Sequence, residues 1–336
     1  MFLSHAGTQR ISGGLGYQFT LWGEAAVDVF FVVSGFVIAQ AAQGRSARDY
    51  AVARVARLAS VVLPCLALGW AMDMAGPRWG PEVYAAAPRF EGAAGVGQVL
   101  SSLLFLDQLW FRAAQPGSNL PFWSLCFEAW YYLAFGLAVF LKRPWNWVAG
   151  AAALLVAGPK IALLAPLWAL GVACRHVCAA GGVPRSAGWV LIAAPLALVL
   201  WEPGERSCFP FMPFTGEAGC LADLGHDYAV GVLFAAQILG VHALAPMLAS
   251  ALGPLLARIA RPVAWLAGAS FTLYLLHYPL LHFLAAASPW PAAHGGTRAL
   301  VFLLPPLAAL LLAEATERRR GAWRRVVGAM IGRRAA

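Results

Sequence analysis

Two acidic side chains stand inside apolar stretches, where an ionised carboxylate is unfavourable. Asp28 comes just before the apolar run 29–38, and Glu128 lies within the apolar run 123–133. A charged side chain on a lipid-buried helix costs about 3 kcal/mol, so such residues usually face a bundle interior or an aqueous cavity and mark functional sites. Both are therefore candidate site residues, although Asp28 is equally suited to cap its helix.

Two further polar patterns could take part in proton transfer or ligand binding. His5 has the side chain type best suited to remove a proton from a hydroxyl near neutral pH, although a frayed terminus is the ordinary alternative. Ser270, Tyr274 and His277 are spaced by four and three, which places them on one helix face. We expect them to line a site, while a buried structural histidine is the alternative for His277.

The run that contains Glu128 carries other polar and aromatic groups. Tyr132 follows about one helical turn later, and Trp123 and Ser124 precede it at the expected outer end of the segment. We expect all three to line the same site as Glu128. A purely structural bond to a neighbouring helix is the alternative role for this glutamate.

Arg54 and Arg57 lie one helical step apart, so both side chains can point to one face. A guanidinium fork matches the oxygens of a phosphate, so the pair is suited to bind a phosphorylated ligand. The alternative is ordinary positive charge at a membrane surface, which already explains the nearby Arg45 and Arg48.

Composition places these residues on membrane helices. The 336 residues are 61% hydrophobic and only 12% charged, with a mean hydropathy of +0.69, which excludes a soluble domain. We predict an all-α, polytopic helical bundle of about nine spans. They are expected at residues 25–42, 58–75, 122–141, 147–158, 161–173, 187–201, 228–247, 263–285 and 299–314. In the first, the small residues Ser34 and Gly35 favour close helix packing, and Ser34 is also a candidate to line the site.

The net charge of +9 lies in clusters between the apolar runs, which argues against nucleic-acid binding. Every second loop is basic, so those loops and the C-terminus are expected in the cytoplasm. Segment 98–111 is then re-entrant or interfacial. The outer loop 202–227 contains Cys208 and Cys220, which would be able to pair if that side is oxidising. We expect no metal, because Cys174, His176 and Cys178 form only a lone cluster at a helix end.

The same alternation requires the first span to start outside, so the pattern predicts a tenth span before Met1. The expected domains are a transmembrane domain at 1–316 and a basic cytoplasmic tail at 317–336.

The ordered set of motifs resembles the membrane-bound acyltransferase-3 family, which O-acylates bacterial surface and exported polysaccharides. The resembling pieces are residues 23–38 as the second helix, Arg54 and Arg57 in R-x-x-R, Trp123 to Glu128 as W-S-L-x-x-E, Ser270 to Pro279 as S-x-x-x-Y-L-x-H-x-P, and Glu317 near the end. Two features depart from the family pattern. The first helix is absent except for residues 2–5, and Ala129 stands where many members have a second acidic residue.

The resemblance implies an integral membrane enzyme that transfers an acyl group, with acetyl expected, from cytosolic acyl-CoA to a hydroxyl of a surface or exported carbohydrate or glycoconjugate. It implies that His5 is catalytic, with Glu128 assisting, and that Arg54 and Arg57 bind the donor. Acetyl-CoA is then a co-substrate and no cofactor is needed. The expected location is the bacterial inner membrane, with a periplasmic partner protein as an open option. The rival functions are a multi-pass transporter, although we find no internal repeat, and an inactive truncated family member.

Overall fold

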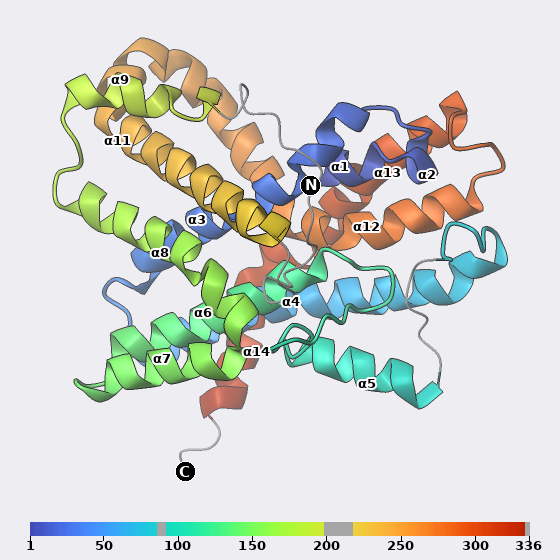
Figure 1. The fold of residues 1–336 in the computed structure, drawn as a ribbon, viewed down its shortest axis with the longest axis horizontal. Coiled ribbons are helices and arrows are strands. Elements are labelled where there is room, and N and C mark those ends of the chain that lie inside the picture. Colours follow the sequence, from blue (N-terminus) through green and yellow to red (C-terminus); the bar gives the residue numbers. More distant parts are fainter. Residues whose placement is uncertain (86–91, 198–217, 333–336) are drawn as a thin grey trace. The chain divides into compact units, whose positions relative to one another are not determined.

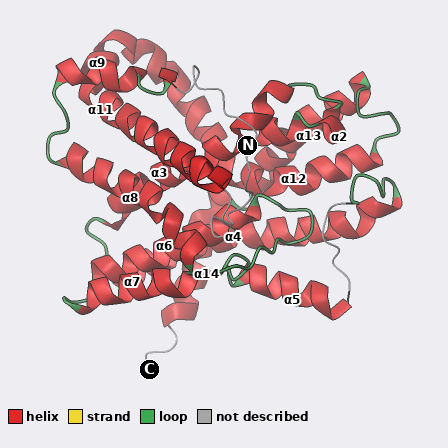
Figure 2. Ribbon diagram, viewed as in Figure 1, coloured by secondary structure: helices red, strands yellow, loops and turns green. Residues whose placement is uncertain are grey.

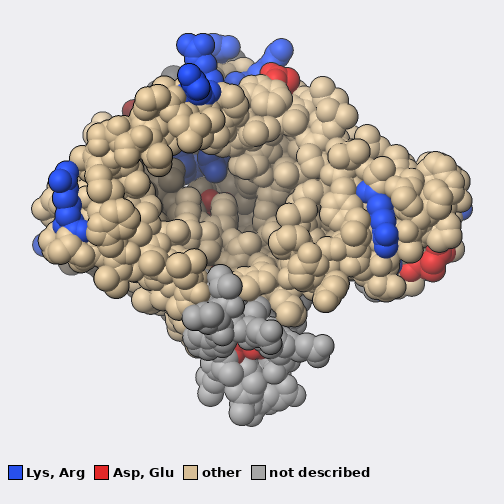
Figure 3. Space-filling model, turned by 90° about the horizontal axis from the view of Figure 1, so that it is seen from above, with Lys and Arg blue, Asp and Glu red and all other residues tan. Residues whose placement is uncertain are grey.

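The computed structural model describes residues 1–85, 92–197 and 218–332. Helices joined by loops make up these ranges, and none of the residues within them forms a strand (Figure 2). Seven helical segments in the described ranges are long and apolar enough to cross a membrane. The chain is therefore an all-α, multi-pass membrane protein, as predicted. Most of the surface visible in Figure 3 belongs to uncharged residues, as expected for a membrane protein.

The chain divides into two compact units, each described here by itself. Unit 1 comprises Met1–Gly23, Ser46–Ala129 and Ala264–Ala336, and unit 2 comprises Glu24–Arg45 and Trp130–Val263. Unit 1 contains α1 (Phe2–Ala6), α2 (Gln9–Ser12), η1 (Tyr17–Trp22), α4 (Ala47–Ala75), η2 (Gly76–Arg78), α5 (Gly92–Leu103), α12 (Ser270–Ala287), α13 (Gly295–Ala313), η3 (Glu317–Arg319) and α14 (Arg320–Gly332). Unit 2 contains α3 (Gly23–Ala42), α7 (Trp145–Ala157), α8 (Pro159–Ala179) and α9 (Arg185–Ala193). Helices α6 (Phe122–Phe140) and α11 (Ala218–Ala267) run through the unit boundaries.

Helix α12 is central to unit 1. It packs against α13 and α4, and the short helices α1 and α2 pack against it as well (Figure 1). Helix α14 packs against α4, so residues 317–332 of the expected basic tail are helical and belong to this unit. The candidate site residues Ser270, Tyr274 and His277 therefore lie on α12, and His5 and Arg57 lie on helices that pack against it.

The N-terminal segment is fixed onto unit 1 by specific contacts. Arg298 Nε donates a hydrogen bond of 3.0 Å to the carbonyl of Ser12. Gly13 has a φ of +61°, and a Cβ placed there would lie 2.7 Å from that of Ala293, so only glycine fits this turn. Ala6 and Ile11 are buried in one apolar cluster with Leu281 and Val301. These contacts hold α1, and therefore His5, in a defined place.

Helices α3 and α8 of unit 2 approach each other closely at two glycines. A Cβ on Gly35 would lie 1.9 Å from the carbonyl oxygen of Trp168, and one on Gly171 would lie 1.9 Å from that of Val32. Trp168 Nε1 also donates a hydrogen bond of 3.2 Å to Ser34 Oγ. In lipid, helix association depends on such van der Waals and polar contacts, because the lipid tails are as apolar as the side chains. The prediction that Ser34 and Gly35 allow close packing is confirmed.

We expect Gly171→Ala to destabilise the protein by about 2 kcal/mol, because the new methyl group collides with backbone that cannot rotate away. The apparent melting temperature in detergent measures this effect. Gly253→Ala is the matched control, because this helical glycine has open space around it. An unchanged melting temperature for Gly171→Ala would show that the two helices move apart freely.

Three sequence predictions differ from the structure in detail. Helix α11 continues through Arg258 and Arg261, which were expected in a loop. Its interior is rich in Ala and Leu, which favour helix, and prolines are tolerated in membrane helices. Helices α7 and α9 have 13 and 9 residues and are short for spans. Helix α5 has 12 residues and begins at Gly92, before the segment 98–111 that is expected not to cross, and ends within it. Cys208 of the proposed Cys208–Cys220 pair lies outside the described residues.

Candidate active site

Unit 1 brings two histidines from distant parts of the sequence together. His5 on α1 stacks on His277 of α12, with ring centroids 5.4 Å apart and an interplanar angle of 28°. The Nε2 atoms of both rings are buried and have no hydrogen-bond partner among the described residues. A buried ring nitrogen without a protein partner is costly, so this arrangement is suited to a ligand that supplies the missing hydrogen bond.

The surroundings of His277 fix which of its nitrogens carries the proton. Nδ1 lies 3.0 Å from the carbonyl oxygen of Leu273. A carbonyl oxygen only accepts, so Nδ1 carries the hydrogen and Nε2 of the neutral ring keeps its lone pair. The main chain of α12 therefore orients the ring and leaves Nε2 as a proton acceptor.

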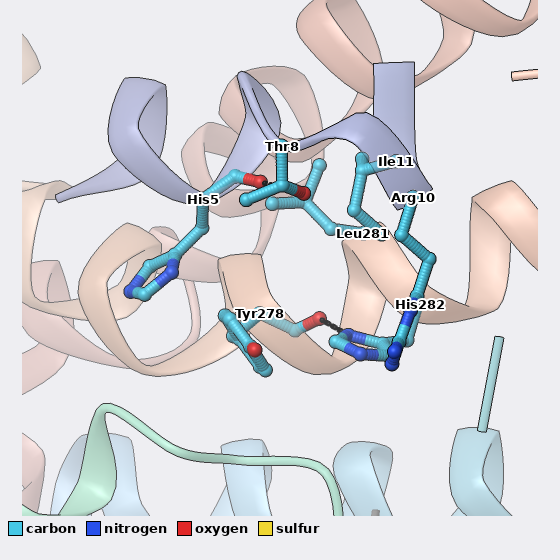
Figure 4. Close-up of a pocket in the computed structure, with 7 residues that line it drawn as sticks. All are labelled: His5, Thr8, Arg10, Ile11, Tyr278, Leu281 and His282. Atoms are coloured by element: carbon cyan, nitrogen blue, oxygen red, sulfur yellow. Dashed lines mark hydrogen bonds between the residues drawn. The ribbon is translucent and has the colours of Figure 1, made fainter. Parts of the chain in front are cut away.

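A pocket opens beside His5. It has a volume of about 340 Å³ and lies between the N-terminal segment and α12 (Figure 4). The residues that line it are His5, Thr8, Arg10, Ile11, Tyr278, Leu281 and His282. The ring of Tyr278 meets that of His5 edge-on, with centroids 4.5 Å apart. Thr8 donates a hydrogen bond of 3.0 Å to the carbonyl of His5, which helps to hold the end of α1.

Glu128, at the C-terminal edge of the α6 segment in unit 1, is buried. Its charge acts on Tyr274 and Tyr50, whereas the charges that act on His5 come from His277, the N-terminus and His282. Tyr274 Oη lies 2.5 Å from Ser124 Oγ, which links α6 to α12.

Other predicted site residues occupy different places. Trp123 is buried in unit 1, in contact with the ring of Phe127. Ser270 is exposed and donates a hydrogen bond of 2.8 Å to the carbonyl of Ala267, the last residue of α11. Asp28, Ser34 and Tyr132 belong to unit 2, where all three are buried.

The R-x-x-R pair lies on α4 beside the beginning of α12. The guanidinium of Arg57 lies over the ring of Phe271, 5.5 Å from its centroid, and that of Arg54 lies 6.0 Å from the ring centroid of Tyr50. Glu317 follows the apolar helix α13, and its Oε2 accepts hydrogen bonds of 2.9 and 3.0 Å from the amide and hydroxyl of Thr272. This buried carboxylate fixes the beginning of α12 next to Arg57.

The pocket residues Arg10, Tyr278 and His282 were not identified as site residues from the sequence. Arg10 and His282 belong to none of the sequence motifs. The only available signal was proximity along the chain, because Arg10 follows His5 and Tyr278 follows His277.

A family model described as an acyltransferase domain matches residues 1–316. The chain belongs to the acyltransferase-3 family. This confirms the resemblance stated from the motifs. Searches of curated proteins and of solved structures gave no match. Acyltransferase-3 membership, together with the apolar helices, makes this chain a multi-pass membrane acyltransferase. The match includes both histidines and the R-x-x-R pair and ends just before Glu317 and α14.

Burial holds the pKa of His5 well below its usual value of 6.5, and the positive charge of His277 lowers it further. A general base acts in its neutral form, and a lowered pKa keeps His5 neutral to lower pH. We therefore expect kcat/KM for acyl transfer to stay constant down to pH 6.5 and to fall only below it. Initial rates between about pH 5 and 8 test this expectation. A fall that begins above pH 6.5 would contradict it.

Proposed function

We propose that this acyltransferase-3 member moves an acyl group, acetyl in the first instance, from cytosolic acyl-CoA to a hydroxyl of a surface or exported carbohydrate or glycoconjugate. The observation that carries the proposal is the buried His5–His277 pair, whose Nε2 atoms have no partner among the described residues, beside a pocket of about 340 Å³. Such a pair is suited to deprotonate a hydroxyl that enters the pocket.

In a direct transfer, neutral His5 accepts the proton of the acceptor hydroxyl while its oxygen attacks the thioester carbonyl carbon. A C–O bond forms and the C–S bond breaks, so the products are an O-acyl ester and the CoA thiolate. The proton held by the histidine pair is then available to the thiolate. In this proposal His277 is the second proton acceptor of the pair, because its Nε2 also keeps a lone pair.

The donor side rests on the basic residues of α4. Arg54 and Arg57 have the planar, forked donors that phosphate oxygens prefer. Arg57 lies over Phe271, and His277 lies further along the same helix, a rise of about 9 Å. The phosphates and the thioester of acyl-CoA are separated by the pantetheine arm. A phosphate site and a reaction site at two levels of α12 suit such a ligand.

The proposed location is the bacterial cell membrane, with Arg54, Arg57 and the C-terminus on the cytoplasmic side. The basic residues at the start of α4 and in η3 and α14 support this orientation. A periplasmic partner that passes acyl groups onward is compatible with it.

Acyl transfer from radiolabelled acetyl-CoA in membranes tests the proposal. We expect label in a product ester that hydroxylamine releases, and loss of at least about 100-fold in rate for His5→Ala. Thr8→Ser is a control in the same turn, because it keeps the hydroxyl that binds the carbonyl of His5. Label that resists hydroxylamine, or equal rates for His5→Ala and the unchanged protein, would refute the proposed chemistry.

A further inference from the structure

The pocket beside His5 has a positive charge on Arg10 and no negative charge in its lining. Its seven lining residues include one arginine and two histidines and contain no acidic residue. Arg10 extends beside His282 in Figure 4, and its charge acts on both His282 and Tyr278. Among the described residues Arg10 forms no ion pair. Its hydrogen bond is a long one, 3.5 Å, to the carbonyl of Val83.

An arginine without a carboxylate partner in a pocket is suited to bind an anion, because its fork donates two parallel hydrogen bonds to a carboxylate or phosphate. Arg10 is exposed, so water hydrates its guanidinium when no ligand is bound, and no acidic residue of the lining competes with an anionic ligand for it. The ligand is therefore the group best placed to provide a negative charge.

His282 and Tyr278 offer contacts of a different kind. Nδ1 of His282 lies 3.1 Å from the carbonyl oxygen of Tyr278, so Nδ1 carries the hydrogen and Nε2 keeps its lone pair. A neutral His282 accordingly accepts a hydrogen bond, as from a sugar hydroxyl. The aromatic ring of Tyr278 lies between His5 and His282, with ring centroids 4.5 and 4.6 Å away. An aromatic surface between polar groups is typical of ligand sites with mixed apolar and polar faces.

From this arrangement we propose that the acceptor is an acidic sugar, whose carboxylate or phosphate binds Arg10 while a hydroxyl of the same molecule lies at His5. This inference rests on the proposed function, which supplies the role of His5. It adds the chemical class of the acceptor and makes Arg10 a specificity-determining residue. Carboxylate and phosphate share the chemistry that Arg10 recognises, and the experiment separates them.

Three matched glycosides test the inference: 4-nitrophenyl β-glucoside, the corresponding glucuronide and the corresponding glucoside 6-phosphate. Binding to the purified full chain is measured by equilibrium dialysis without donor, and acetyl transfer is measured in parallel. We expect at least one anionic glycoside to bind about tenfold more tightly than the neutral one. The preferred anion identifies the group. Arg10→Gln should remove the preference and leave binding of the neutral glycoside unchanged, and Arg10→Lys should keep part of it.

Arg78→Gln is the matched control, because Arg78 is exposed and lies outside the pocket lining. Equal binding of all three glycosides by the unchanged protein would overturn the inference, as would an equal loss for all three in Arg10→Gln or the same loss of preference in Arg78→Gln. The protein would keep the inferred specificity if it preferred an anionic glycoside through Arg10 but transferred no acetyl group. That result would support the inference on the pocket and refute the proposed reaction.

Discussion

His277→Asn is expected to lower kcat for acyl transfer by about 100-fold or more, with little change in the binding of acyl-CoA. Asparagine keeps an N–H group near the position of Nδ1, so it is able to maintain the bond to the carbonyl of Leu273. It has no counterpart of Nε2, which is the buried atom without a partner among the described residues. A positioned general base typically contributes 10²–10⁴ in rate. Single-turnover rates with labelled acetyl-CoA separate this effect from binding.

The double variant with His5→Ala tests whether the two rings act as a unit. If they do, the combined loss should be close to that of either single change, because groups that act together are strongly non-additive. A wild-type rate for His277→Asn would instead leave His5 as the base and assign His277 a structural role at the stacked ring contact of 5.4 Å.

Glu317→Ala is expected to destabilise unit 1 by about 2–3 kcal/mol, because buried donors of Thr272 lose their charged acceptor. Its carboxylate is 4% exposed and accepts both hydrogen bonds from Thr272, and its Oε1 lies 3.4 Å from a guanidinium nitrogen of Arg320. Without it, the buried amide and hydroxyl of Thr272 lose their carboxylate acceptor. The beginning of α12 then loses its anchor, and α12 carries His277.

The effect is measured in detergent as a loss of folded protein. The yield from size-exclusion chromatography and the apparent melting temperature both report this loss. Glu317→Gln should cost less, because the amide oxygen still accepts a bond from Thr272. Glu314→Ala is the control in the same segment, because the Glu314 side chain is 61% exposed and pairs with Arg318 at the surface, where ion pairs contribute little. Equal losses for Glu314→Ala and Glu317→Ala would show that the buried network has no special weight.

Much of the fold class follows from the sequence, because composition alone decides whether a chain of this length can be soluble. The apolar runs also place some spans to within a few residues, as for the helices Phe122–Phe140 and Gly295–Ala313. Helix ends were less well predicted where prolines and arginines interrupt the apolar pattern, as in Ala218–Ala267. Prolines stop helices in water but are tolerated in membrane helices, so local signals mislead there.

The sequence by itself determined the membrane class, the R-x-x-R pair and the motifs that place the chain in the acyltransferase-3 family. Only the tertiary structure showed that His5 stacks on His277, that Glu317 anchors the beginning of α12, and that Arg10 shares a pocket with His282. The physical reason is that lipid-facing and core-facing surfaces of a membrane helix are both apolar, so hydrophobic periodicity does not reveal which faces meet. Contacts between residues far apart in the chain depend on that choice of faces.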